Sequence, residues 1–160
     1  MLSDGTVTLI EVNPAQAQEL AEGRCPLPCL ADYPHADTAA AARMARGSFE
    51  IDNWTPGFGM HLIGRVDDGL VVGDVGFHAP PDERGVVEIG YGLAPSARGR
   101  GLASRAVRLL IADALARPNV AHVLAETSPD NPASVRVLEA CGFARIATRG
   151  RDVRYRYPGR

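Results

Sequence analysis

Two glycines and two arginines stand close together where a strand pattern gives way to a helix pattern. The stretch PSARGRGLASRA, residues 95–106, follows the strand-like VVEIGYGLA and continues into the helix-like VRLLIADALA. The first N–H groups of a helix lack partners within the helix and carry the positive end of its dipole. Glycines let the backbone approach phosphate oxygens closely. The turn therefore predicts a site for an anion, and for a phosphate compound first of all.

One interpretation of this turn is a dinucleotide-binding fingerprint, which would make the protein a nucleotide-dependent oxidoreductase. The run from Gly99 to Ser104 matches G-x-G-x-x-[GA] except at its last position, and Glu126 stands where an acidic residue would hold a ribose. Residues 94–98, however, separate the glycines from the strand, and the chain contains no second β-α-β half. A nucleoside-triphosphate loop is excluded because the chain has no G-K-[ST] sequence.

Three segments in a fixed order favour a second interpretation. RGRGLA (98–103) fits the [RQ]-x-x-G-x-[GA] pyrophosphate loop of the GNAT acyltransferases, and NPASVRVLEACGF (131–143) resembles their N-x-x-[SA]-x-x-x-[YL]-x-x-x-G-F segment. EIGYGLAP (88–95) resembles the strand that precedes the loop. The joint match, over about residues 86–143, is much more specific than any one motif. The chain thus resembles the GNAT superfamily, and most closely its ribosomal-protein alanine N-acetyltransferase branch.

This resemblance implies acetyl-CoA as co-substrate, with no metal, bound where two neighbouring parallel strands, here 86–93 and 120–126, splay apart. The strand end would pair with the pantetheine amides, and the N–H groups of the turn would hold the pyrophosphate. A Cβ at Gly99 or Gly101 would collide with that group. The residues implied to bind the co-substrate are Tyr91, Gly92, Leu93, Arg98, Gly99, Arg100, Gly101, Leu102, Ala103, Ser104, Asn131 and Ser134. The two arginines face either the 3′-phosphate or solvent, and Asn131 orients CoA, caps a helix, or does both.

The family's reaction moves an acetyl group from a thioester to an amine, so the amine loses a proton and the leaving thiolate gains one. Glu88 and Glu126 lie on the two splayed strands, and carboxylates in partly buried sites have raised pKa values suited to a base. The alternative for each is an ordinary solvated strand-end acid. Many relatives have a tyrosine at the position of Leu138, and leucine cannot protonate a thiolate. Ser134 is the substitute that the resemblance implies.

The amine acceptor is expected across the site from CoA, and is either a peptide or protein N-terminus or a small amine. Tyr33, Trp54, His61 and His78 come from segments that could line it, with core packing as the alternative for each. The missing tyrosine also leaves open a non-catalytic acyl-CoA-binding or sensing module.

The elements around these motifs predict an α+β protein. Alternating apolar patterns and turn signals place strands at 6–12, 60–66, 69–78, 86–93, 120–126, 144–148 and 153–157. Capping residues and helical periodicity place helices at 14–22, 37–46, 102–116 and 132–141. The resemblance implies a GNAT-like fold, in which a mixed, mostly antiparallel sheet of about six to seven strands contains a splayed parallel pair and is flanked by about four helices.

The bulk composition limits the classes of partner. The 160 residues fit a single domain, 1–160, and the net charge of −2 disfavours a nucleic-acid binder. No apolar stretch approaches the roughly 20 residues that span a bilayer, and no signal segment is evident, so we expect a cytoplasmic protein. We also expect the protein to be a monomer or a homodimer. Cys25, Cys29 and Cys141 are odd in number, which argues against a disulfide framework. Cys25 and Cys29 lack a second ligand pair, so no metal site is expected.

Overall fold

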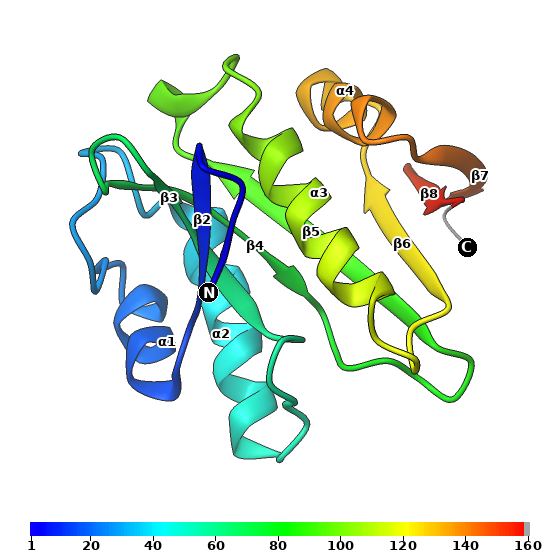
Figure 1. Ribbon diagram of the computed structural model, residues 1–160, viewed down its shortest axis with the longest axis horizontal. Helices are drawn as coiled ribbons and strands as arrows, with labels where there is room; N and C mark the ends of the chain where they lie inside the picture. Colours follow the sequence, from blue (N-terminus) through cyan, green and yellow to red (C-terminus); the bar gives the residue numbers. More distant parts are fainter. Residues whose placement is uncertain (159–160) are drawn as a thin grey trace.

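A mixed sheet runs through the molecule in the order β1-β2-β3-β4-β5-β6-β8-β7 (Figure 1). The computed structural model describes residues 1–158, and within them the sheet has eight strands. Their bounds are β1 Leu2–Ser3, β2 Val7–Glu11, β3 Met60–Arg65, β4 Val71–Phe77, β5 Val86–Leu93, β6 His122–Thr127, β7 Ala144–Arg149 and β8 Asp152–Tyr157. Only β5 and β6 run parallel in this part of the chain. The predicted α+β class and mostly antiparallel sheet are confirmed.

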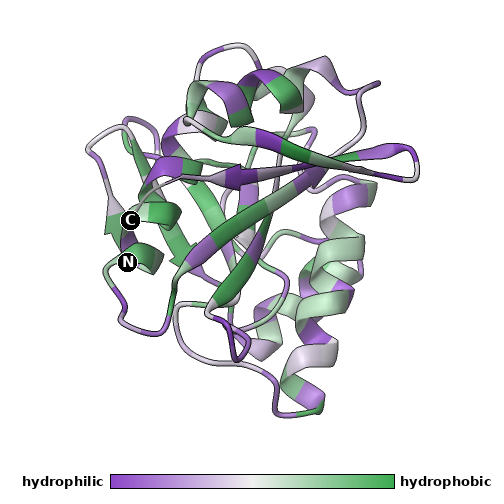
Figure 2. Ribbon diagram, turned by 90° about the vertical axis from the view of Figure 1, so that its right-hand side faces the viewer, coloured by the Kyte–Doolittle hydropathy of each residue, from purple (hydrophilic) through white to green (hydrophobic). Residues whose placement is uncertain are grey.

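Helices cover both faces of the sheet, with α3 on one face and α1 and α2 on the other (Figures 1 and 2). Their bounds are α1 Pro14–Ala21, α2 Ala36–Glu50, α3 Leu102–Leu115 and α4 Pro132–Ala140. Figure 2 shows hydrophobic residues on the strands between these layers and polar residues gathered in the loops. None of the helices in the described part of the chain combines the length and the apolar character needed to cross a membrane.

Capping residues set the helix ends as the sequence predicts. Asn13 accepts a hydrogen bond from the N–H of Gln16, which closes a capping box in front of Pro14 at the start of α1. Asn131 caps α4 in the same way, by accepting from the N–H of Ser134 at 3.1 Å. Gly142 has a left-handed φ of +88° just past α4.

The parallel pair separates halfway along β5, as the resemblance implies. Register between β5 and β6 runs from Val86↔His122 to Ile89↔Ala125 and stops there. Beyond Ile89, β5 continues to Leu93 and pairs only with β4, on its other side. Among the described residues, the backbone of 90–93 therefore has no strand partner on the side where β6 would lie.

Three of the differences from the sequence prediction have a local physical cause. β1 was not predicted, because two residues that pair at a sheet edge carry no periodicity. Helix α2 extends to Glu50 instead of ending near residue 46, because its alanine-rich sequence and packing against α1 outweigh the weak propensity of Gly47 and Ser48. β6 begins at His122, two residues later than expected, because the N–H groups of Ala121 and His122 both bond the Gly85 carbonyl.

Candidate active site

The glycine turn leaves the N-terminus of α3 open. Gly101 is the residue that precedes the helix, has φ +75°, and supplies no side-chain cap, and Gly99 is also left-handed with φ +79°. An added Cβ at either glycine meets no protein atom within 4 Å, so the backbone conformation itself calls for glycine there. Among residues 1–158, no side chain accepts a hydrogen bond from the first N–H groups of α3, and this fits the binding of the diphosphate of a nucleotide ligand.

A cavity of about 380 Å³ adjoins this turn and lies between the end of β5, the start of α3 and α4. It brings together nearly all residues that the sequence assigns to the co-substrate: Tyr91, Gly92, Leu93, Arg98, Gly99, Gly101, Leu102, Ala103, Ser104, Asn131 and Ser134 line it. We call it the donor cavity. Arg100 lies outside it and lines a neighbouring groove with Arg105 and Arg108. The described residues hold no group of three or more His, Cys, Asp or Glu side chains placed to bind a metal ion.

The phenol side chain of Tyr91, on β5, lies at the donor cavity and contacts α4. The Tyr91 hydroxyl lies 2.8 Å from Ser134 Oγ and 3.0 Å from the Ser134 carbonyl oxygen, joining β5 to α4. Burial raises the pKa of Tyr91 to about 12, so its hydroxyl keeps its proton at neutral pH. Leu138 is fully buried in the core. The sequence predicted only a backbone role for Tyr91, and the pairing with Ser134 became visible only once α4 was placed.

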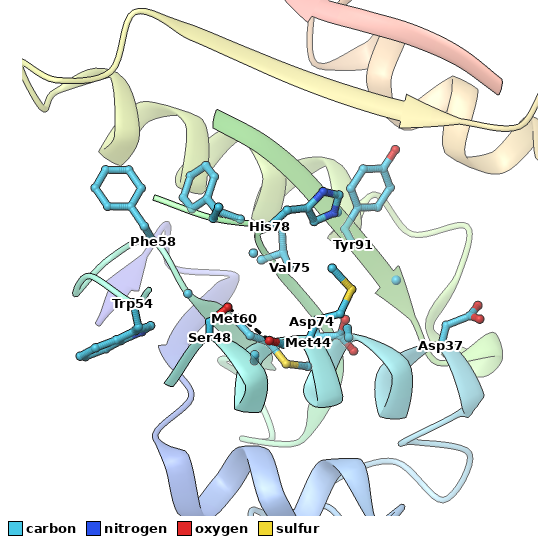
Figure 3. A pocket seen from close by; sticks show the side chains of 18 of the residues that line it. Asp37, Met44, Ser48, Trp54, Phe58, Met60, Asp74, Val75, His78 and Tyr91 are labelled. Carbon is cyan, nitrogen blue, oxygen red and sulfur yellow. Dashed lines mark hydrogen bonds between the residues drawn. The ribbon is translucent and has the colours of Figure 1, made fainter. Parts of the chain in front are cut away.

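A second cavity, of about 150 Å³, lies on the opposite face between α2 and strands β3 to β5 (Figure 3). We call it the acceptor cavity. Most of its wall is apolar or aromatic, from Ala41, Met44, Ala45, Phe49, Trp54, Phe58, Met60, Val75 and Phe77. Four residues line both cavities: His35, Asp37, Tyr91 and Gly92. The two cavities therefore meet beside the part of β5 that has left β6.

His78 and Glu88 form a pair at the edge of the acceptor cavity. His78 Nδ1 lies 3.3 Å from Glu88 Oε2, and the His78 ring lines the cavity while Glu88 does not. The ring lies over Gly90, where an added Cβ would come within 3.0 Å of His78 Nε2. A side chain at position 90 would therefore push the imidazole aside. This geometry connects Glu88 to the cavity through the imidazole.

Glu126 lies apart from both cavities. It faces Arg154 across the β6–β8 pair, with its Oε2 3.4 Å from Arg154 Nε. The pairing between β5 and β6 stops one residue before it, at Ala125. The structure therefore places Glu88 beside His78 at the edge of the acceptor cavity and leaves Glu126 in an ion pair with Arg154.

Two of the four residues predicted for the acceptor site line the acceptor cavity, Trp54 and His78. Tyr33 is buried and its hydroxyl donates to Asp74. His61 lies in another hollow, with Nε2 3.8 Å from Glu11 Oε2, and burial lowers its pKa in spite of that neighbouring carboxylate. Neither Tyr33 nor His61 lines the acceptor cavity.

Asp74 lines the acceptor cavity, although the sequence pattern did not single it out. It lies in the middle of β4 and is 7% exposed. Its Oδ2 accepts hydrogen bonds from Tyr33 at 2.9 Å and Thr38 at 3.0 Å. Burial raises the pKa of Asp74, and these two bonds oppose that shift. The available signal was a single carboxylate within the apolar strand VVGDVGF.

Two comparisons relate this sequence to known proteins. Residues 7–144 match the family model described as an acetyltransferase (GNAT) domain. An uncharacterized N-acetyltransferase of Bacillus subtilis (strain 168), YjdG, is 35% identical over 112 residues, which is 70% of this chain and 67% of the relative.

Solved structures share the fold at low sequence identity. RimL, the ribosomal L7/L12 alpha-N-protein acetyltransferase solved with coenzyme A, superposes with a TM-score of 0.69 at 19% identity, over 98% of this chain and 95% of that one. The microcin C7 self-immunity acetyltransferase MccE, solved with acetyl-CoA and AMP, gives 0.67 at 15% identity, over 96% and 92%.

Proposed function

Because this chain belongs to the GNAT acetyltransferase family and is an N-acetyltransferase, we propose that it transfers an acetyl group from acetyl-CoA directly to a primary amine. One observation carries the proposal: the donor and acceptor cavities meet at Tyr91 and Gly92, where β5 has separated from β6. A thioester and an amine that enter from opposite faces of the sheet would come together there. Holding two reactants in one geometry supplies about 7–11 kcal/mol of the barrier in favourable cases.

The donor cavity suits CoA along its length. The open N-terminus of α3 and its two left-handed glycines would hold the diphosphate. The backbone of 90–93, which lacks a partner on the β6 side, would pair with the amides of the pantetheine arm. Asn131 is already engaged as the cap of α4, so we assign it the task of holding Ser134 in place.

Acetyl-CoA supplies a thioester whose carbonyl carbon the amine attacks, so that a C–N bond forms, the C–S bond breaks, and one proton leaves the nitrogen while one reaches the sulfur. We assign to His78 the removal of the proton from the amine nitrogen. Glu88, whose carboxylate lies at Nδ1 of His78, orients the imidazole. We assign the hydrogen bond to the sulfur to Ser134 Oγ, supported by Tyr91. We assign Glu126 only a minor electrostatic role, because its carboxylate forms an ion pair with Arg154 and the residue lines neither cavity.

The acceptor is a primary amine with a small head group, either a small molecule or the first residue of a peptide. A cavity of about 150 Å³ holds a group the size of a benzene ring. An aminoglycoside or a folded polyamine is too large to enter it whole. Family membership also favours catalysis over a non-catalytic acyl-CoA sensor and over a dinucleotide-dependent oxidoreductase.

Thiol release from acetyl-CoA tests this proposal. The acceptors are short peptides with varied first residues, benzylamine, amino acids, polyamines and aminoglycosides, and the product is identified by mass spectrometry. We expect release with small-headed amines only, and none with the wild-type protein when amine is omitted. Tight acetyl-CoA binding by calorimetry, with no release on any amine, would contradict the proposed transfer.

A further inference from the structure

Asp74 faces the acceptor cavity, and the proposed transfer chemistry does not use it. Its carboxylate is 7% exposed, and both of its described hydrogen bonds end on the same oxygen, Oδ2. The other oxygen, Oδ1, accepts no hydrogen bond from any residue in the described part of the chain. A buried ionised carboxylate is costly unless both oxygens have partners. One oxygen at the cavity thus lacks a donor.

No arginine or lysine among the described residues lines the acceptor cavity to balance the charge of this carboxylate. Two carboxylates, those of Asp37 and Asp74, line it. The hydroxyls of Tyr33 and Thr38 donate to Asp74, and the imidazole of His35 and the carboxylate of Asp37 are its titratable neighbours. His35 Nε2 is itself buried without a hydrogen-bond partner in the described chain. The cavity has carboxylates but no permanent cation of its own.

The position of Asp74 ties it to the point where the cavities meet. Asp74 pairs with Gly92 across β4 and β5, and Gly92 lines both cavities. The apolar side chains of Met44 and Trp54 also line the cavity (Figure 3), as does that of Phe49. A ligand complementary to both Asp74 and the apolar wall would have a positively charged group at Asp74 and an apolar body about the size of a benzene ring.

We infer that Asp74 determines acceptor specificity by binding the acceptor as an ammonium cation, and that the acceptor class is a compact primary amine with an apolar body. This inference rests on the proposed function, because it assigns the amine to the same cavity. Asp74 then contributes mainly to acceptor binding. The bound ammonium releases one proton to solvent before the neutral amine attacks the thioester, and the transfer step remains with the residues around Tyr91 and His78.

A purely structural role for Asp74 makes a different prediction. Its bonds to Thr38 and Tyr33 tie α2 and the preceding loop to β4. The variant Asp74→Asn keeps a carbonyl oxygen that can accept both bonds and loses only the charge. If the role is structural, the variant changes neither probe's affinity. If the role is recognition, it changes the affinity for cations alone.

The test compares benzylamine with benzyl alcohol, which differ by the ammonium group. Their dissociation constants are measured by ligand-observed NMR titration without acetyl-CoA, for the wild-type protein, Asp74→Asn and the control Asp37→Asn. We expect the wild-type protein to prefer benzylamine by about tenfold, as for a charged hydrogen bond. Asp74→Asn should bind both probes equally, with unchanged circular dichroism and acetyl-CoA affinity, while Asp37→Asn keeps most of the preference.

Three outcomes would overturn the inference: no preference in the wild-type protein, a full preference retained by Asp74→Asn, or neither probe binding. Loss of the preference in Asp37→Asn alone would also overturn it, since the cation would then bind at Asp37. Thiol release with the acceptor panel is measured separately. Release without the cation preference refutes only the role of Asp74, and a cation preference without release on any amine refutes only the proposed transfer.

Discussion

The two cavities differ in how far apart along the chain their lining residues lie. The donor cavity is lined mainly by two short stretches of chain, 91–104 and 131–140, which include the two left-handed glycines of the turn. The acceptor cavity is lined by residues of several separate segments, namely α2, the loop before β3, and strands β3 to β5. Backbone sites require particular residues at fixed spacings, because only glycine tolerates the conformation or the close approach. Side-chain sites require only that distant segments meet. The first kind is therefore visible in a sequence, and the second becomes visible when the chain is folded.

The largest expected effect breaks the donor side at its backbone. Gly101→Val places a β-branched side chain at φ +75°, beside the N–H groups that would hold the diphosphate. We expect the dissociation constant for acetyl-CoA to rise at least about a hundredfold, or about 2.7 kcal/mol. Isothermal titration calorimetry measures it directly.

A matched control separates strain from loss of the site. Gly150 is also left-handed, with φ +62°, and lies in the turn between β7 and β8 with no atom near an added Cβ. Gly150→Val should lose similar stability and keep its acetyl-CoA affinity. Equal affinity in both variants would remove the glycine turn from the donor site.

The second prediction concerns the His78–Glu88 pair at the edge of the acceptor cavity. We expect His78→Gln to lower kcat/KM for the amine by about thirtyfold, because a general base typically contributes 10²–10⁴-fold and water replaces part of it. Glu88→Gln should cost less, and should cost almost nothing more in the His78→Gln background, because Glu88 reaches the cavity through the imidazole. Steady-state kinetics over a range of amine concentrations measures all three variants.

His122 provides the control for this pair. It lies on β6 with Nδ1 3.0 Å from Arg156 and lines neither cavity. His122→Gln should leave kcat/KM unchanged. Two results would contradict the assignment: independent, additive losses for His78 and Glu88, or complete loss of activity in Glu88→Gln while acetyl-CoA still binds.

The same division explains how far the sequence could lead. It predicted the α+β class, the helix starts at Pro14 and Pro132, the cap at Gly142 and most of the donor cavity, since each rests on local chemistry. It also selected Trp54 and His78, which line the acceptor cavity, but it did not select Asp74. The burial and hydrogen bonds of that carboxylate depend on Thr38 and Tyr33, which lie far from it along the chain. The sequence also could not show that Tyr91 reaches Ser134, since that contact needs the position of α4.

The third prediction tests side-chain chemistry within the donor side. Ser134→Ala should lower kcat about tenfold by removing the hydroxyl proposed to contact the sulfur. Tyr91→Phe should lower kcat by a smaller factor, because the phenol acts through Ser134 at 2.8 Å. In a double-mutant cycle, Tyr91→Phe should have almost no effect once Ser134 is alanine. A full additional loss in the double variant would show that Tyr91 acts independently of Ser134.

The fourth prediction concerns the stability cost of the acceptor side. Burial raises the pKa of Asp74 in the folded protein above its unfolded value of 3.8. The folded state therefore binds the proton more tightly, so this contribution to stability is full below the unfolded pKa and is lost as the pH rises through the folded pKa. Asp74→Asn cannot ionise and should be more stable than the wild-type protein at neutral pH by about 1 kcal/mol, with little difference near pH 4.

Thermal unfolding at several pH values measures this difference. Tyr33→Phe is the matched control, since it removes one hydrogen bond to Asp74 and leaves the carboxylate. It should lose about 1 kcal/mol at neutral pH. If Asp74→Asn is less stable than the wild-type protein at neutral pH, the carboxylate serves the fold more than the cavity.

The smallest expected effect lies outside both cavities, at the carboxylate that the sequence ranked beside Glu88. Glu126 faces Arg154 across the β6–β8 pair, where 24% of the Glu126 side chain and 27% of the Arg154 side chain are exposed, and it lines neither cavity. Glu126→Gln should therefore change kcat/KM by less than about threefold, measured in the thiol-release assay beside Glu88→Gln. Both carboxylates follow similar strand patterns, so the difference between them would come from the splay alone: Glu88 precedes the last β5–β6 pair and meets His78, whereas Glu126 follows it and meets Arg154. A larger loss for Glu126→Gln than for Glu88→Gln would reverse that argument and place the base on β6.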